Sequence, residues 1–259
     1  MSVGTDPRAV ETNRGYYERL TRGRDDYWRK MAAPRQRLRV LLRLLEEEPP
    51  ARVADLGCGN GALLREVHGR LPEALLCGLD LSCSQIEANR RDLPELRWEA
   101  ADLEAPLPED GGMVDSFDAV IASEIIEHVG APEALLRNAR RLARPGRGRL
   151  LLSTQSGPLR ETERRVGHQR HFTREEMEEL LRGAGWEVVR VWNCGFPFHD
   201  LSKWFANRDP DASMARFGER PYGPIERLVC LALRLAFLLN SRRRGAQLFA
   251  VARRPDDPD

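Results

Sequence analysis

The chain has 259 residues, 41 basic and 40 acidic side chains, and a formal net charge of +1. That length allows one large domain, or one domain with an insertion, and the balanced charge excludes a general attraction to nucleic acid or membrane. The five cysteines are scattered and form no CxxC pair, which argues against a disulfide framework or a structural zinc site. We therefore expect a cytoplasmic protein from a reducing compartment.

Leucines recur at helical spacing up to about Glu48, and two prolines at positions 49 and 50 end this pattern. We therefore predict a helical N-terminal cap over residues 1–50. The second predicted region, residues 51–259, is a larger domain. No stretch of the chain is apolar and long enough to predict a membrane span.

Short β-type runs alternate with helix-length segments from residue 52 onward. Such alternation predicts βαβ units and a mostly parallel sheet, and right-handed crossovers place helices on both faces. The expected strands are 52–56, 75–81, 96–101, 117–123, 148–154, 186–192 and 247–253. The expected helices between them are 61–71, 84–92, 132–143 and 174–184. We therefore predict an α/β fold: a Rossmann-like, doubly wound sheet of seven strands.

A segment at about 193–246 separates the last two predicted strands, and we interpret it as a helical insertion. So long an excursion inside a domain is usually functional or an interface. It contains a predicted amphipathic helix near residues 225–240, followed by a basic triplet at Arg242, Arg243 and Arg244. A solvated turn explains the triplet, and an anionic membrane or a phosphate-bearing carrier is the alternative.

The most informative motif runs from Val53 to Gly61, VADLGCGNG, at the junction of a predicted strand and a predicted helix. Asp80 ends the second predicted strand, and Asp102 and Glu124 follow the third and fourth. These acids lie at strand carboxyl ends, where open α/β sheets bind ligands. The glycines have GxGxG spacing and not the GxGxxG of dinucleotide-binding proteins. Asp55 in front of them disfavours a pyrophosphate and suits the cationic S-adenosylmethionine.

The stretch from Asp55 to Gly61 resembles the acidic residue, x, GxGxG motif of class I methyltransferases, and the resemblance extends over about residues 52–192. It implies S-adenosylmethionine as the cofactor, with the glycine loop against its methionine part. It also implies that Asp80 holds the ribose and that Asp102, with the Leu103 backbone, meets the adenine. The predicted cofactor-binding residues are Asp55, Gly57, Gly59, Asn60, Gly61, Asp80, Leu81, Asp102, Leu103 and Ser123. The alternative is that the glycines and acids are ordinary turn and cap residues.

Two segments carry candidate catalytic groups. The first follows the fourth predicted strand, and on a helix its Glu124, Glu127 and His128 would share one face. The second contains His168 and His171 and follows the fifth predicted strand. Both segments open onto the same rim of the sheet, where they can meet beside the methyl donor. The candidate catalytic residues are His128, Glu124 and His171.

A divalent metal ion is one interpretation of these groups. The Glu-x-x-Glu-His segment resembles that of ubiquinone-biosynthesis O-methyltransferases and, more closely, that of the 2′-O-methyltransferases of small silencing RNAs. The second resemblance implies metal ligation by Glu124, Glu127, His128 and His171, and such an ion could chelate a diol and acidify one hydroxyl. The alternatives are His128 as a general base without metal, or neither role. The near-zero net charge does not support an RNA acceptor.

The wider stretch, through GHQRHFT to Gly185-Trp186, is similar to bacterial methyltransferases of small molecules and sugars. We therefore predict O-methylation of a hydroxyl on a sugar, polyketide or phenolic natural product. The alternatives are N-methylation of a small-molecule amine, metal-dependent 2′-O-methylation of RNA, and S-adenosylmethionine binding without methylation. The expected partners are a small-molecule acceptor and, for a homodimer, a second copy. A monomer is equally compatible with the sequence, and no specific nucleic acid is expected.

Overall fold

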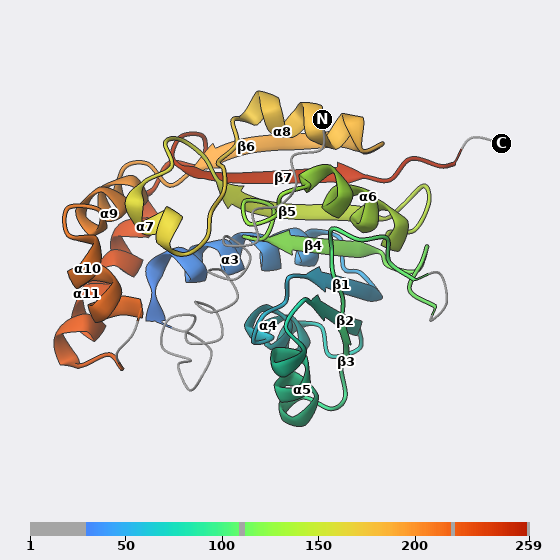
Figure 1. Cartoon of the computed structure of the whole chain (residues 1–259), viewed down its shortest axis with the longest axis horizontal. Coiled ribbons are helices and arrows are strands. Elements are labelled where there is room, and N and C mark those ends of the chain that lie inside the picture. Colours follow the sequence, from blue (N-terminus) through green and yellow to red (C-terminus); the bar gives the residue numbers. More distant parts are fainter. Residues whose placement is uncertain (1–29, 109–111, 219–220, 258–259) are drawn as a thin grey trace.

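The central element of the structure is a seven-stranded sheet in the order β3-β2-β1-β4-β5-β7-β6 (Figure 1). The computed structural model describes residues 30–108, 112–218 and 221–257. The strands are β1 (Arg52–Leu56), β2 (Leu75–Asp80), β3 (Arg97–Ala100), β4 (Ala119–Ser123), β5 (Arg149–Gln155), β6 (Glu187–Cys194) and β7 (Gln247–Arg253). All pairings are parallel except those of β7, which runs antiparallel to β5 and β6. The predicted doubly wound, mostly parallel fold is confirmed.

Helices cover both faces of this sheet (Figure 1). Along β4, Val120 and Ala122 pack into one hydrophobic cluster and Ile121 into the other, because successive strand residues point to opposite faces. The first cluster includes side chains of α6 (Pro132–Leu142) and α8 (Arg174–Gly183). The second includes side chains of α3 (Ala32–Glu47), α4 (Ala62–Arg70) and α5 (Cys83–Asp92). The strands are therefore buried on both sides, as parallel sheets require.

Helix α3 is the described part of the predicted N-terminal cap. Leu41 and Leu45 are fully buried and share a cluster with Val53 of β1 and Leu151 of β5. Their spacing is the helical repeat from which the helix was predicted. The first 29 residues of the predicted cap lie outside the described residues. The division into a cap and a larger domain remains a prediction.

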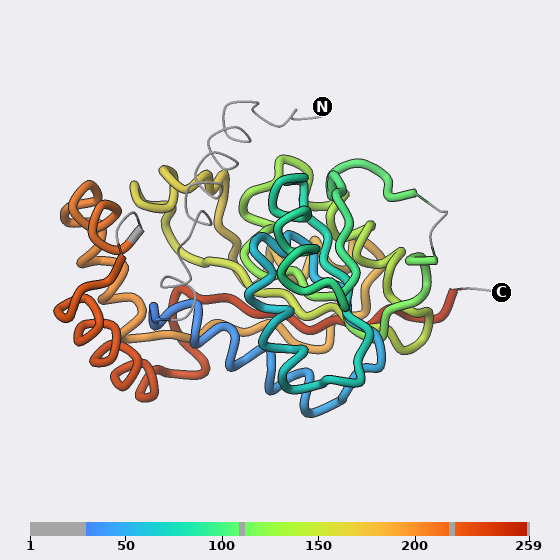
Figure 2. Tube along the Cα trace, turned by 90° about the horizontal axis from the view of Figure 1, so that it is seen from below, coloured from blue at the N-terminus to red at the C-terminus, as the bar shows by residue number. Residues whose placement is uncertain are grey.

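Helices fill the segment between β6 and β7 and form one end of the molecule (Figures 1 and 2). They are α9 (Phe198–Ala206), α10 (Pro210–Ser213), the π-helix η1 (Met214–Gly218), α11 (Pro224–Ala236) and the 3-10 helix η2 (Phe237–Leu239). Helix α11 packs on α3 and α9. The short helix α7 (Glu161–Arg165) precedes α8 in the chain and is joined to α9 by the ion pair of Glu163 with Lys203. Among the described residues, no helix is long and apolar enough to cross a membrane.

Candidate active site

The glycine loop links β1 to α4 at the carboxyl edge of the sheet. Gly59 and Gly61 both have left-handed backbones, with φ of +50° and +70°. A Cβ at Gly61 would lie 2.7 Å from Trp98 Cη2, so that position is closely packed. A Cβ at Gly59 would meet nothing within 4 Å. The backbone at Gly59 therefore faces open space, which lets a ligand approach it closely.

Asp80 is held against this loop by backbone groups. The Gly59 N–H donates to its Oδ2 at 2.8 Å, and the Ser82 N–H donates to its Oδ1 at 2.9 Å. A carboxylate accepts about four hydrogen bonds, so each oxygen keeps a position for one further donor. Burial raises the pKa of Asp80, and these two hydrogen bonds oppose that effect. The remaining acceptor positions fit the two hydroxyls of a ribose.

Asp55 lies beneath the loop, where its side chain is only 2% exposed. Burial, and then the charge of Asp80, raises the pKa of Asp55 well above its usual range. A cationic ligand above the loop would favour the ionised forms of both acids, because opposite charges attract more strongly where water is excluded. The arrangement fits a sulfonium or ammonium group better than a phosphate.

The other predicted cofactor-binding residues lie on the same edge. The Asn60 side-chain oxygen accepts from a backbone N–H two residues on, at 3.2 Å, and Leu81 is half exposed beside Asp80. Asp102 is exposed, whereas the Leu103 side chain is buried. Ser123 Oγ lies 2.9 Å from the hydroxyl of a serine in β5. Their roles in cofactor binding remain predictions.

Alanine substitutions at two glycines should separate cofactor binding from folding. We expect Gly59→Ala to lower the affinity for S-adenosylhomocysteine at least tenfold, at a cost of only about 1–2 kcal/mol in stability for a left-handed alanine. Gly61→Ala adds a clash with Trp98 and should cost about 1–3 kcal/mol more. Calorimetric titration and thermal unfolding measure the two effects. Gly69→Ala in α4, where a Cβ meets open space, is the control, and equal binding by Gly59→Ala and this control would contradict the assignment.

The segment after β4 differs from the sequence prediction. We predicted that Glu124, Glu127 and His128 share a helix face, but residues 124–129 form a turn and α6 begins only at Pro132. The prediction of a helix is wrong because Glu124 has a left-handed backbone, with φ of +54°, which interrupts a right-handed helix. The turn packs on the glycine loop, since a Cβ at Gly57 would lie 2.9 Å from the Ile125 side chain.

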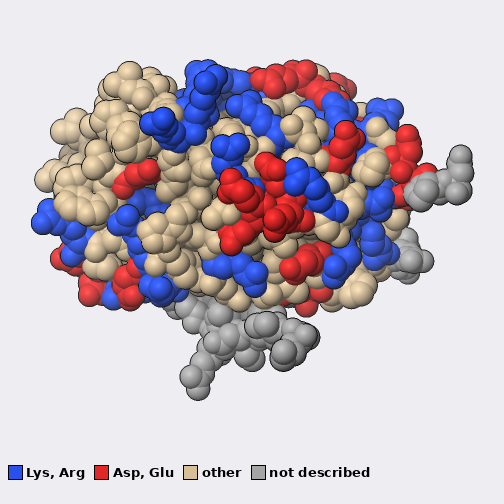
Figure 3. Space-filling view, turned by 90° about the horizontal axis from the view of Figure 1, so that it is seen from above, with Lys and Arg blue, Asp and Glu red and all other residues tan. Residues whose placement is uncertain are grey.

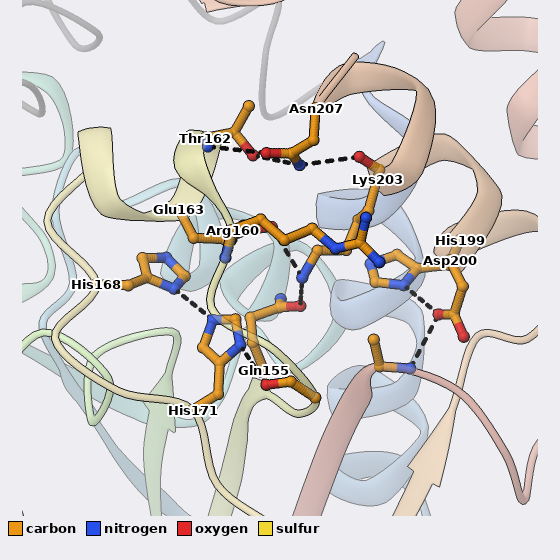
Figure 4. A network of polar contacts seen from close by, with 12 residues as sticks. Gln155, Arg160, Thr162, Glu163, His168, His171, His199, Asp200, Lys203 and Asn207 are labelled. Carbon is orange, nitrogen blue, oxygen red and sulfur yellow. Dashed lines mark hydrogen bonds and ion pairs between the residues drawn. The ribbon is translucent and has the colours of Figure 1, made fainter. Parts of the chain in front are cut away.

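Glu124 belongs to a chain of polar contacts across the edge of the sheet. Its Oε2 accepts from Gln155 Nε2 at 2.6 Å and lies 3.4 Å from Arg37 Nη1 of α3. Gln155 Oε1 in turn accepts from Lys203 Nζ of α9 at 3.1 Å, and the same ammonium lies 3.0 Å from Glu163 Oε1 of α7 (Figure 4). These contacts link the helical segment after β6 to the edge of β5.

Sequence reasoning missed Arg37, Gln155, Glu163 and Lys203. The sequence does contain one signal for Lys203, which is the rarity of lysine: only two of the 41 basic residues are lysines. Its four-carbon stem carries a compact ammonium that two separate acceptors can share, which a planar guanidinium does less well.

Three side chains converge beyond the turn. The ligating atoms of Glu127, His128 and His168 all lie within 4.8 Å of one another. Glu127 is completely buried, its Oε2 accepts from Thr154 Oγ1 at 2.8 Å, and its Oε1 has no hydrogen-bond partner among the described residues. Burial, and then the charge of Glu124, raises the pKa of Glu127 well above its usual range. Burial lowers the pKa of His128 to about 4.

A row of hydrogen bonds fixes the protonation of His168 (Figure 4). His171 Nδ1 lies 3.1 Å from the Gly157 carbonyl oxygen, which only accepts, so this nitrogen carries a proton. In a neutral His171 the Nε2 is then an acceptor, and it receives the proton of His168 Nδ1 across 3.1 Å. Burial lowers the pKa of both rings. His168 therefore keeps an unprotonated Nε2, with its ring 4.6 Å from that of His128 between centroids.

The predicted metal ligands are only partly brought together. Glu127 and His128 meet, but Glu124 is engaged by Gln155 and Arg37 and lies outside the cluster. Both ring nitrogens of His171 take part in hydrogen bonds, so it supports His168 and does not face the cluster. His168, which was not among the predicted metal ligands, takes that place. The motif GHQRHFT contains both histidines, and spacing alone did not distinguish them.

Comparison with known proteins finds relatives that are O-methyltransferases. A malonyl-[acyl-carrier protein] O-methyltransferase of Hahella chejuensis is 37% identical over 117 residues, 44% of this chain and 40% of the relative. A ubiquinone biosynthesis O-methyltransferase of Xanthomonas oryzae pv. oryzae is 38% identical over 108 residues, 40% of this chain and 43% of the relative. This chain thus matches less than half the length of either relative.

The structure of the N-methyltransferase NodS from Bradyrhizobium japonicum, in complex with S-adenosyl-l-homocysteine, has a similar fold. Its TM-score is 0.59 at 16% identity, covering 95% of this chain and 99% of that one. The model of a methyltransferase domain family matches residues 27–191, more than half of the chain. The chain therefore belongs to the family of S-adenosylmethionine-dependent methyltransferases.

Proposed function

We propose that this protein transfers the methyl group of S-adenosylmethionine to a hydroxyl oxygen of a small molecule. The observation that carries the proposal is the pair of imidazoles of His128 and His168, which follow β4 and β5 and lie 4.6 Å apart between ring centroids. A hydroxyl loses its proton when it becomes a methyl ether, so its methylation needs a nearby proton acceptor. Burial keeps both imidazoles unprotonated at physiological pH, so each is available to accept a proton, and the same burial makes each a weaker base than a free imidazole.

In the proposed reaction, bound S-adenosylmethionine supplies an electrophilic methyl carbon. The glycine loop and Asp80 hold the donor, and the cluster holds the acceptor hydroxyl in line with it. As the new carbon–oxygen bond forms and the carbon–sulfur bond breaks, the hydroxyl proton passes to His168 Nε2. His171 and the Gly157 carbonyl keep that nitrogen oriented and unprotonated beforehand. Glu127 lies close enough to stabilise the imidazolium that results.

The same three side chains fit a divalent cation. Glu127 Oε1 is buried without a partner among the described residues, and two imidazole nitrogens lie within 4.8 Å of a Glu127 oxygen. One carboxylate and two imidazoles suit Zn²⁺, Mn²⁺ or Fe²⁺, and a cation there would acidify an acceptor hydroxyl. Dialysis against EDTA distinguishes the two versions. Unchanged turnover identifies a base without metal, and loss that a divalent ion reverses identifies a metal site.

The test of the function is mass spectrometry of candidate acceptors incubated with the protein and S-adenosylmethionine. Sugars, polyketides and phenols with free hydroxyls should gain the mass of one methylene per turnover, and their deoxy analogues should not. Amine analogues of the same scaffolds are the matched comparison. A mass gain on the amines alone would show that the protein methylates nitrogen and not oxygen. No gain on any acceptor, from a protein that binds the cofactor, would support S-adenosylmethionine binding without methylation.

We further propose that residues 193–246 form the acceptor side of the site. Lys203 connects α9 to Gln155 and Glu163, at the edge where the histidines lie. All predicted cofactor-binding residues precede this segment in the chain. We also propose that the protein lies in the cytoplasm, as its scattered cysteines predict. The proposed acceptor is a natural product, as the resemblance in sequence implies.

A further inference from the structure

An apolar surface lies on α11 and continues onto η2. Its side chains recur every three or four residues along one side of the helix, and we call this set the α11 face. The α11 face consists of Ile225, Leu228, Val229, Leu231, Leu235, Leu238 and Leu239. Leu228 is 66% exposed and Leu239 74% exposed. A helix normally turns such a side towards the core, and contiguous exposed apolar patches mark interaction or membrane sites.

Helix α9 enlarges this surface. It contacts both α11 and η2, and its Leu201, Trp204 and Phe205 are about half exposed. Lys203 of the same helix reaches into the polar network at the end of β5 (Figure 4). The apolar surface and the candidate active site are therefore on opposite sides of one helix. Figure 3 shows the end formed by these helices as a broad area with few charged side chains, with both basic and acidic ones around it.

Positive charge accompanies the α11 face. Residues 221–246 contain five arginines and one acidic residue, Glu226, whereas the whole chain is balanced at +1. Arg242, Arg243 and Arg244 are all exposed and begin three residues after the end of η2. Glu226 Oε1 accepts from Arg216 Nε at 2.6 Å, so this carboxylate is already paired with an arginine. The segment therefore presents leucines together with an excess of four positive charges over negative ones.

We propose that the α11 face seats this protein on an anionic lipid surface. The leucines enter the boundary between headgroups and acyl chains, and the arginines bind the headgroup phosphates. A lipid surface supplies both an apolar interior and negative charge. A second copy of this chain would supply an apolar face, but it would also bring its own arginines. The proposal does not depend on the methyl transfer, because no residue of the α11 face belongs to the candidate cofactor-binding or catalytic residues.

The test is sedimentation of the full-length protein with lipid vesicles. Vesicles of phosphatidylcholine with phosphatidylglycerol should bind the protein, and vesicles of phosphatidylcholine alone should bind at least tenfold less. Two exposed leucines are replaced in the variant Leu228→Glu/Leu235→Glu, which should lose at least tenfold in binding. The matched control places two glutamates at Leu75 of β2 and Val189 of β6, which are 64% and 54% exposed, and it should bind like the wild type.

A second pair of variants tests the charge. Glutamine at Arg242, Arg243 and Arg244 should reduce binding to anionic vesicles at least tenfold, because each arginine near the surface contributes to attraction. Glutamine at the exposed Arg91, Arg137 and Arg174 changes the net charge equally and should leave binding within about twofold. Sedimentation equilibrium without lipid completes the experiment. If the folded wild type does not bind the vesicles, the proposal is overturned. If in addition the wild type is a dimer and Leu228→Glu/Leu235→Glu is a monomer, the α11 face is an interface between two copies of the chain. Binding that the control variants reduce as much as the α11 variants also overturns the proposal.

Discussion

Replacing His168 or His128 by alanine is expected to lower the turnover number of O-methylation by about 100-fold or more, the usual contribution of a proton-transferring side chain. The affinity for S-adenosylmethionine should stay within a few fold, because neither residue is among the predicted cofactor-binding residues. Turnover measured with saturating acceptor, and calorimetric titration of the cofactor, give the two quantities. His68→Ala in α4 is the control, since that ring is half exposed beside Glu95 and far from the cluster along the chain.

His171 acts through His168, so its variants distinguish positioning from simple structural support. His171→Leu removes both hydrogen bonds and should lower turnover nearly as much as His168→Ala. His171→Gln retains an amide N–H for the Gly157 carbonyl and an amide oxygen for His168 Nδ1, and it should restore most of the activity. Near-normal turnover in both His128→Ala and His168→Ala would refute the proton-accepting cluster and leave alignment as the catalytic contribution. Equal losses in the leucine and glutamine variants would refute the positioning role.

The second large effect concerns stability and pH. Burial lowers the pKa of His128 to about 4, whereas an unfolded histidine has a pKa near 6.5. Between these values the unfolded chain binds more protons than the folded one. The stability that depends on a neutral His128 is therefore fully present above pH 6.5 and is lost as the pH falls toward 4. From pH 7.5 to 4.5 the loss amounts to about 2–3 kcal/mol.

The comparison of wild type with His128→Asn isolates this contribution. Asp55 and Glu127 have raised pKa values, so their contributions change with pH in the opposite direction, but both proteins contain them. Urea unfolding in EDTA-containing buffer should show the stability of the wild type falling relative to the variant by about 2–3 kcal/mol over this range. A constant difference between wild type and His128→Asn would mean that the folded protein does not keep this imidazole neutral.

The sequence predicted those parts of the fold whose conformation depends on residues close to one another in the chain. The strands and helices follow from local periodicity, and the glycine loop from a motif of nine residues. The turn at Glu124 escaped prediction because the sequence SEIIEHV has no glycine or proline to mark it. The next residue, Ile125, packs against Gly57, which lies 68 positions earlier in the chain. Such a conformation results from tertiary contacts and leaves no local signal.

The candidate site was predictable in composition and not in arrangement. The carboxyl ends of parallel strands bring the segments after β4 and β5 together, so the meeting of the two histidine-bearing segments could be expected. Which histidine faces the cluster depends on the Gly157 carbonyl, a backbone group with no sequence signature. The contact of Lys203 with Gln155 spans 48 residues and depends on how α9 packs. Periodicity carries no information about such long-range contacts.

Calorimetric titration of the full-length protein with S-adenosylhomocysteine and S-adenosylmethionine tests the central claim most directly. We expect one molecule of either ligand to bind per chain. Asp80→Ala should weaken binding by about 1–3 kcal/mol, the value of hydrogen bonds to a charged group. Asp92→Ala, an exposed acid at the end of α5, should bind like the wild type. The absence of binding heat with both ligands, at two temperatures and with a protein shown to be folded by circular dichroism, would contradict the account.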